Sequence, residues 1–168
     1  FASEHLLTPD DVRGDFATLP EALRARGWPR LAEVRGRVFF ALDNTDRIRD
    51  LYLDGHPNLA GRLLFADAGS TDHPAASWFK RNDPIRQFEA IQDLVRSGFL
   101  VRTRADSHTQ QARSGDTTQR DRAFASGAQF VSTDYPEPDP RFSSYHVTLP
   151  EGTEAIANPV TAAPLTAP

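Results

Sequence analysis

Four short apolar runs, each bounded by turn-forming or charged residues, constrain the fold of this chain more than any other feature. They read RVFFAL at 37–42, RLLFA at 62–66, FLVRT at 99–103 and QFVST at 129–133. Runs of this length that are rich in aromatic and branched residues are typical of strands buried on both faces. A fifth segment, 145–149, alternates polar and apolar residues and predicts an edge strand.

Helical signals separate these runs. Thr18 and Glu21 have the spacing of a capping box, and Gly27 is a natural stop for the helix that they begin. Apolar residues three and four positions apart follow Pro84. Helices are therefore expected over 19–26, 46–53, 85–97 and 116–126. Strands that alternate with helices pair in parallel through right-handed crossovers, so the sequence predicts an α/β fold.

The length of 168 residues suits one domain. We expect this domain over 1–150, followed by an irregular tail, 151–168, that is rich in Pro, Ala and Thr. Parallel strands of this number suit a small doubly wound sheet or half of a (β/α)8 barrel, which takes about 250 residues. The chain has no methionine and begins at Phe1, so we expect a piece of a longer chain and favour the half barrel.

Composition excludes several classes of function. The net charge of −4 disfavours a general electrostatic nucleic-acid binder, which needs a basic field. No apolar run approaches the roughly 18 residues of a transmembrane helix. The absence of cysteine removes disulfides, thiolate catalysis and cysteine zinc sites. The sequence also lacks a glycine-rich phosphate loop, a nucleophile elbow and HExxH, which argues against nucleotide hydrolases, α/β-hydrolase esterases and zincins.

Polar residues follow each predicted strand. Ligands of parallel α/β folds bind outside the carboxyl ends of the strands, and carboxylates with arginines there suit a hard divalent cation and an anionic substrate. An Asp after a strand also commonly caps the next helix or forms an Asx turn, and this alternative stays open. The strand-end residues in question are Asp43, Asp67, Arg102, Arg104, Asp106, Asp134 and Tyr135.

Two further features adjoin these strand ends. Lys80 and Arg81 precede the helix predicted after Pro84 and could hold a phosphate, or they are a solvated pair while Asp83 caps that helix. His108 is the one histidine placed where a general acid or base could act, although a loop histidine is usually only solvated.

Several long segments are similar to one family. They are LTPDDVRG (7–14), GWPRLAEVRGRVFFALDN (27–44), FKRNDP (79–84), GFLVRTRAD (98–106) and GAQFVSTDYP (127–136). They resemble the bacterial calcium-dependent phosphoinositide phospholipase C family, and the likeness runs from about Leu6 to Asn158. Two departures are Ala157, where a Cys is expected, and Asp67, which stands where a phosphate-binding Lys is expected.

The resemblance implies the C-terminal half of a distorted TIM barrel. It implies a calcium-dependent phosphodiesterase that cleaves phosphatidylinositol at a membrane surface to diacylglycerol and an inositol phosphate, with two histidines as general base and acid. Asp43 would be a calcium ligand. Contacts to inositol hydroxyls or phosphate would come from Lys80, Arg102, Arg104, Asp106, Asp134 and Tyr135.

The family's two catalytic histidines precede the segment at 7–14, so none of the five histidines here is expected to be catalytic. We therefore expect the chain alone to be inactive, and to self-associate through the open edge of its half barrel. Localisation stays open between a secreted bacterial protein and other compartments, since the region that would carry a signal peptide is not in this sequence. The alternatives are a glycerophosphodiester phosphodiesterase-like barrel that acts on soluble headgroup diesters, and a non-catalytic remnant or binding module.

Overall fold

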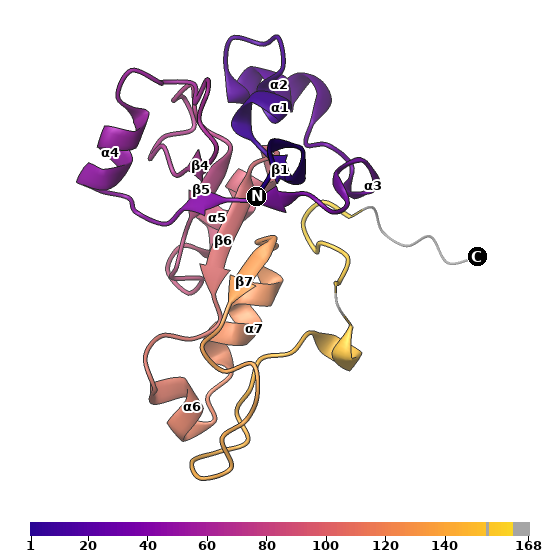
Figure 1. Ribbon diagram of the computed structural model, residues 1–168. Coiled ribbons are helices and arrows are strands. Elements are labelled where there is room, and N and C mark those ends of the chain that lie inside the picture. The colour runs from indigo at the N-terminus through magenta and orange to yellow at the C-terminus, as the bar shows by residue number, and fades with distance from the viewer. Residues whose placement is uncertain (154, 163–168) are drawn as a thin grey trace. The chain divides into compact units, whose positions relative to one another are not determined.

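A computed structural model describes residues 1–153 and 155–162, and the chain forms two compact units (Figure 1). Unit 1 comprises residues 1–80 with 97–99, and unit 2 comprises 81–96 with the described residues from 100 onward. The elements of unit 1 are a 3₁₀ turn Ser3–His5, β1 Leu6–Leu7, α1 Pro9–Arg13, α2 Leu19–Arg26, α3 Leu31–Val34, β2 Val38–Phe39, β3 Ala41–Leu42, α4 Arg47–Leu53, β4 Phe65–Ala66 and β5 Trp78–Lys80. Those of unit 2 are α5 Phe88–Arg96, β6 Leu100–Arg104, α6 Gln110–Ser114, α7 Thr118–Ala125, β7 Phe130–Ser132 and a 3₁₀ turn Pro150–Gly152.

The strands of unit 1 pair in parallel. Strand β1 pairs with β2, and β3 pairs with β4, with Leu42 opposite Ala66. A parallel pair needs a crossover connection, and helices α1 to α3 lie in the first crossover while α4 lies in the second. Strand β5 lies beside β4. The predicted α/β arrangement with parallel strands is therefore present in this unit.

Aromatic packing forms the core around β2 and β4. Phe65 is fully buried and stacks on Phe39, with ring centroids 4.5 Å apart. Trp28 packs against both rings and donates its indole N–H to the Gly98 carbonyl at 3.0 Å. Because aromatic side chains bury large apolar areas, this cluster holds β2 and β4 in place. The polar strand ends follow β4 and its neighbours β3 and β5.

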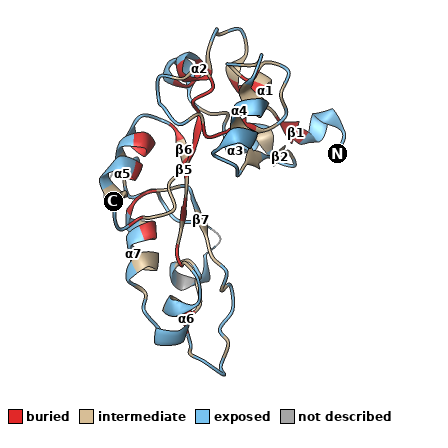
Figure 2. Ribbon diagram, turned by 90° about the vertical axis from the view of Figure 1, so that its left-hand side faces the viewer, coloured by how far each residue is buried: buried red, intermediate tan, exposed pale blue. Residues whose placement is uncertain are grey.

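Unit 2 is built around the parallel pair β6 and β7, with Thr103 opposite Val131. The crossover between these strands contains α6 and α7. Helices α5 and α7 both pack against β6. Figure 2 shows buried segments along β6 and on parts of α5 and α7. Ile91 and Val95 of α5 and Ala123 of α7 are buried.

Burial alternates along β6 because side chains of a strand point to opposite faces in turn. Val101 and Thr103 are fully buried, whereas Arg102 and Arg104 are half-buried. The alternation therefore leaves two arginines on the face of β6 that the buried residues do not occupy.

Three sequence predictions need correction. The segment 145–149 is not a strand: Tyr145 is buried by itself, and Val147 N–H makes a single backbone bond to the Tyr135 carbonyl at 2.9 Å, so no ladder forms. The run at 37–42 splits at Phe40 into β2 and β3. The helix expected from 85 begins at Phe88 because the Asp83 carboxylate holds the backbone N–H groups of Ile85 and Arg86 in a turn.

The domain boundary at 150 stays a prediction, and part of the predicted tail lies outside the described residues.

The capping box of α2 gives a test of this local structure. Thr18 accepts the Glu21 N–H at 3.3 Å, and Glu21 accepts the Thr18 N–H at 3.2 Å. We predict that Thr18→Ala lowers the free energy of unfolding by about 1 kcal/mol in urea titrations. Thr109→Ala is the control, since Thr109 precedes α6 without a side-chain cap bond. Equal losses of unfolding free energy in the two variants would contradict the assignment of Thr18 as the side-chain cap of α2.

Candidate functional site

Three strand ends bring polar residues together in unit 1. Asp43 follows β3, Asp67 follows β4, and Lys80 ends β5. Because β3 and β4 are parallel and Leu42 lies opposite Ala66, Asp43 and Asp67 leave the sheet at the same edge. We call Asp43, Asp67 and Lys80 the strand-end cluster.

Lys80 joins the two acids of the strand-end cluster. Its Nζ lies 3.1 Å from Asp43 Oδ2 and also donates to the Asp43 carbonyl. Its backbone N–H donates to Asp67 Oδ2 at 2.9 Å. The Lys80 side chain is only 16% exposed, whereas that of Asp43 is 75% exposed. The ammonium is thus held in place by a partly buried stem, while the carboxylate faces solvent.

Asp67 has a positioning role within this cluster. The residue is buried, and its Oδ1 accepts the Gly69 N–H at 2.9 Å while Oδ2 accepts that of Lys80. The Asp67 carbonyl accepts Arg49 Nη1 at 3.2 Å. Both carboxylate oxygens therefore bind backbone, and the side chain fixes the ends of β4 and β5.

The described residues do not by themselves form a calcium site. Calcium takes six to eight oxygen ligands. Within residues 1–153 and 155–162, no three His, Asp or Glu side chains are placed so that they could hold one metal ion together. Asp43 offers one exposed carboxylate, which suits a hard cation, but Lys80 already contacts it. Asp67 is occupied by backbone donors.

The arginines of β6 make separate contacts in unit 2. Arg102 donates to Asn82 Oδ1 at 2.8 Å, and Arg104 Nη2 lies 3.0 Å from Asp134 Oδ2. Arg104 Nε is buried and has no hydrogen-bond partner among the described residues. A guanidinium with an unused N–H on one edge can accept an anion there, since its donors form a planar fork.

Asp106 is fully buried at the centre of a hydrogen-bond network. Its Oδ2 accepts Thr133 Oγ1 at 2.5 Å and the Tyr145 hydroxyl at 3.3 Å, and its Oδ1 accepts the Asp134 N–H at 3.1 Å. Burial, together with the Asp106 charge, raises the pKa of Tyr145 to about 12. These contacts place the Asp106 carboxylate inside a hydrogen-bond network, and its expected contact with substrate stays a prediction.

Tyr135 lies close to this network. Its backbone N–H donates to Thr133 Oγ1 at 2.9 Å, and its ring packs edge-on against that of Tyr145. Its hydroxyl donates to the His108 carbonyl at 3.1 Å. Tyr135 thus links the end of β7 to the loop after β6, and it approaches the backbone of His108 rather than its imidazole.

No two histidine rings are paired in the described part of the chain. His56 Nδ1 lies 2.7 Å from the Ala60 carbonyl, His73 Nδ1 accepts the Ala75 N–H at 3.1 Å, and His146 Nδ1 lies 2.9 Å from the Ser144 carbonyl. Burial, with the Arg49 charge, lowers the pKa of His73. These contacts are local and belong to turns.

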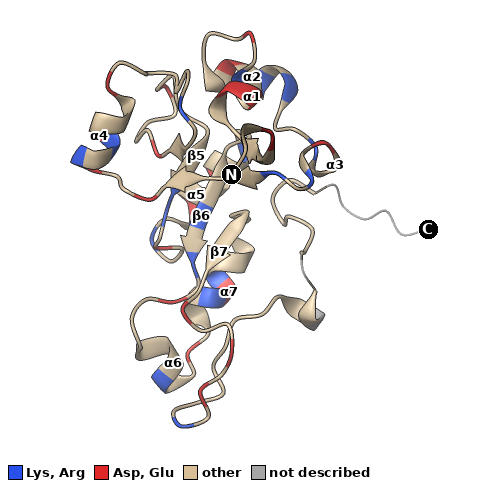
Figure 3. Ribbon diagram, viewed as in Figure 1, with Lys and Arg blue, Asp and Glu red and all other residues tan. Residues whose placement is uncertain are grey.

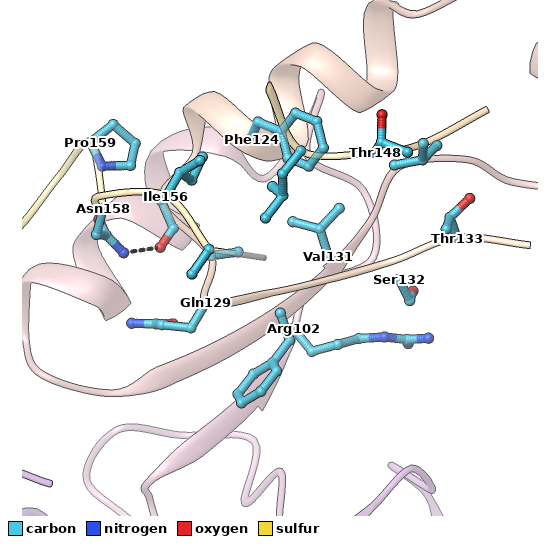
Figure 4. Close-up of a pocket in the computed structure, with 16 residues that line it drawn as sticks. Arg102, Phe124, Gln129, Val131, Ser132, Thr133, Thr148, Ile156, Asn158 and Pro159 are labelled. Carbon is cyan, nitrogen blue, oxygen red and sulfur yellow. Dashed lines mark hydrogen bonds between the residues drawn. The ribbon is translucent and has the colours of Figure 1, made fainter. Parts of the chain in front are cut away.

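A hollow of about 600 Å³ lies beside β7 in unit 2 (Figure 4). Figure 4 shows Phe124 and Val131 on one side of the strand and Arg102 and Ser132 on the other. Asn158 closes one end by donating to the Gly127 carbonyl at 2.7 Å. Among the predicted site residues the hollow contains Arg102 alone, so it does not coincide with the polar strand ends.

Sequence reasoning missed two parts of the site. Lys80 ends strand β5, which is not among the predicted strands, and the largely apolar run from Ala75 to Phe79 is the signal that could have predicted it. Arg49 supports Asp67 from helix α4, and no local pattern points to that contact. Figure 3 shows basic and acidic residues interspersed in each unit, as the modest net charge suggests.

Comparisons with known proteins identify the family. Residues 1–159 match the family described as phosphoinositide phospholipase C, Ca2+-dependent. The chain belongs to this family. Among curated proteins none matches the chain. No helix in the described residues of this phospholipase C family member is long and apolar enough to cross a bilayer.

A solved structure supports the fold. The chain is similar to a Ca2+-dependent phosphatidylinositol-specific phospholipase C from Streptomyces antibioticus, with a TM-score of 0.52 and 17% sequence identity. The match covers 79% of this chain and 54% of that one, so the chain spans about half the length of its structural neighbour. The predicted fold, part of a distorted (β/α)8 barrel, is confirmed by this likeness.

The supporting role of Asp106 can be tested against its neighbour Asp134. Asp106→Ala removes the acceptor of Thr133 Oγ1 and of the Asp134 N–H, and one of the two acceptors of the buried Tyr145 hydroxyl, so we predict a loss of about 2–4 kcal/mol in the free energy of unfolding. Asp134→Ala removes an exposed ion pair and is expected to cost about 0–1 kcal/mol. Urea titrations of both variants measure the difference, and similar costs would argue against a structural role for Asp106.

Proposed function

We propose that this chain is part of a phosphodiesterase that hydrolyses phosphoinositide in a calcium-dependent reaction. The products would be diacylglycerol and an inositol phosphate. Membership of the family supports the reaction class. The observation that carries the proposal for this chain is the strand-end cluster of unit 1, in which a fixed ammonium and an exposed carboxylate lie at the carboxyl ends of parallel strands.

We assign the Lys80 ammonium and the Asp43 carboxylate to different parts of the substrate complex. The Lys80 ammonium suits the negative charge of the phosphodiester, because it is a compact cation held by the backbone contact to Asp67. The Asp43 carboxylate suits one ligand position on a calcium ion. When bound, calcium would lower the pKa of the attacking hydroxyl and neutralise charge at phosphorus. The other ligands would come from residues outside these 168.

Arg104 is proposed as a separate anion contact in unit 2. Its buried Nε has no partner among the described residues, and Asp134 holds the other edge of its guanidinium. Arg102 and Tyr135 are proposed to bind inositol hydroxyls or phosphate with it, and Asp134 to orient Arg104. Asp106 would act indirectly by holding the backbone of Asp134.

The acid and base chemistry is proposed to come from two histidines outside this sequence. Two observations support this: Nδ1 of each of His56, His73 and His146 is engaged in a local turn contact, and the chain spans about half of its structural neighbour. The 168 residues alone are accordingly expected to give no turnover.

The reaction is tested with the full-length protein that contains this chain. We predict phosphatidylinositol turnover that is lost on calcium chelation and restored by added calcium. Turnover of glycerophosphodiesters but not of phosphatidylinositol would favour the glycerophosphodiesterase alternative. No turnover of either substrate would favour a non-catalytic binding module.

The proposed contact from Arg104 gives a residue-level prediction. We expect Arg104→Gln to lower kcat/KM for phosphatidylinositol about tenfold or more, because a charged hydrogen bond to phosphate is lost. Arg86→Gln is the matched control, since the Arg86 side chain is 87% exposed and its nearest acid lies 3.7 Å away. Steady-state kinetics measure kcat/KM for phosphatidylinositol with both variants. If Arg104→Gln behaves like Arg86→Gln, Arg104 does not contact the substrate.

A further inference from the structure

An aromatic ring and two guanidinium groups lie together on the surface of unit 2. Phe142 is 58% exposed, and the guanidinium carbons of Arg113 and Arg141 lie 5.4 and 5.6 Å from the centre of its ring. We call Arg113, Arg141 and Phe142 the arginine–phenylalanine surface. We propose that this surface binds a phospholipid membrane, with the Phe142 ring in the layer between headgroups and acyl chains. This inference rests on the proposed function and deepens it, because it names the residues that would hold the membrane in which the substrate lies.

Hydrogen bonds fix the turn that carries Phe142. The backbone N–H groups of Phe142 and Ser143 donate to the Asp139 carbonyl at 3.0 and 3.1 Å. Ser143 Oγ donates to the carbonyl of Ala112 in α6, next to Arg113. Figure 1 shows the loop after β7 beside α6. An exposed apolar side chain is by itself common, but this one is presented by a structured turn, so its insertion into a membrane requires little further ordering of the chain.

The arginine–phenylalanine surface lies at the carboxyl ends of the strands of unit 2. Helix α6 follows β6, and the loop with Phe142 follows β7, which is parallel to β6. Arg104 ends β6 and Tyr135 comes shortly after β7, and both are proposed substrate contacts. Tyr135 also lines a cavity of about 100 Å³ together with Arg113 and Phe142. A membrane that presents a lipid headgroup to Arg104 and Tyr135 therefore approaches the side of unit 2 on which Phe142 is exposed.

The charged groups around Phe142 differ in what they can bind. Arg141 donates to both carboxylate oxygens of Asp139, at 2.9 and 2.6 Å, so these two charges largely cancel. Arg113 has no acidic partner among residues 1–153 and 155–162, and its planar fork matches the oxygens of a lipid phosphate. Exposed Glu137 in the same loop opposes the attraction to anionic lipid. The apolar contribution of Phe142 is therefore expected to dominate membrane binding, with a smaller contribution from Arg113.

Vesicle binding by the full-length protein that contains this chain tests the inference. The probe is sedimentation with vesicles of phosphatidylcholine and phosphatidylserine without inositol lipid, so binding does not depend on recognition of the substrate headgroup. We expect Phe142→Ala to lower the partition coefficient about tenfold, because a large apolar side chain no longer leaves water. Leu31→Ala is the matched control and is expected to bind like wild type, since Leu31 is 71% exposed but lies in α3, before the amino end of β2.

The charge contribution has its own pair of variants. Arg113→Gln is expected to lower the partition coefficient about fivefold on the same vesicles, because one cation near an anionic membrane is lost. Arg96→Gln is expected to bind like wild type, since the Arg96 side chain is 55% exposed but precedes the amino end of β6. Equal effects of Arg113→Gln and Arg96→Gln would contradict the assignment of Arg113 to the membrane surface.

Phe142→Trp separates insertion into lipid from a specific packing contact. We expect this variant to bind vesicles at least as tightly as wild type, because tryptophan favours the membrane interface. A loss as large as that of Phe142→Ala would overturn the proposal. Circular dichroism melts establish that each variant is folded.

The outcomes distinguish this inference from the proposed function, because phosphatidylinositol turnover is measured separately. If the full-length protein gives turnover but Phe142→Ala binds vesicles like wild type, the membrane surface is overturned while the proposed function stands, and a protein partner becomes the better candidate for this surface. If Phe142→Ala weakens vesicle binding but the full-length protein gives no turnover, the proposed function fails while the membrane surface stands.

Discussion

Parallel pairing is the constraint on which the polar arrangement of unit 1 depends. Two parallel strands end at the same edge, so the residues that follow them become neighbours although the sequence separates them. Strands β3 and β4 bring Asp43 and Asp67 to one edge in this way, and buried Asp67 then holds the end of β5. The aromatic stack of Phe39 on Phe65 packs β2 against β4 and buries the Phe65 side chain of this pair.

Much of this was predictable from sequence. The capping box at Thr18, the parallel strands with helical crossovers and the polar strand ends follow from local patterns, and the structure contains each of them. The family follows from long segments such as GAQFVSTDYP rather than from any single residue. These features are visible because each depends on residues that lie close together in the sequence.

The features that sequence reasoning missed share a physical cause, which is that burial depends on distant partners. Asp106 stays a predicted substrate contact, and no local pattern indicates that Thr133 and Tyr145, 27 and 39 positions away, hydrogen-bond to its carboxylate. The alternation at 145–149 suggested a strand, yet Tyr145 is anchored by its side chain and the backbone makes no ladder. Strand β5, which Lys80 ends, is not among the predicted strands, because the apolar stretch before Lys80 is short and polar residues follow it at 81–83.

The central claim is that Asp43 and Lys80 divide the work of holding a cation and a phosphate. A crystal structure of the full-length protein with calcium and an inositol phosphate tests it most directly. The account predicts an Asp43 oxygen on the calcium ion and Lys80 Nζ on a phosphate oxygen. Calcium and phosphate held by other residues would contradict it.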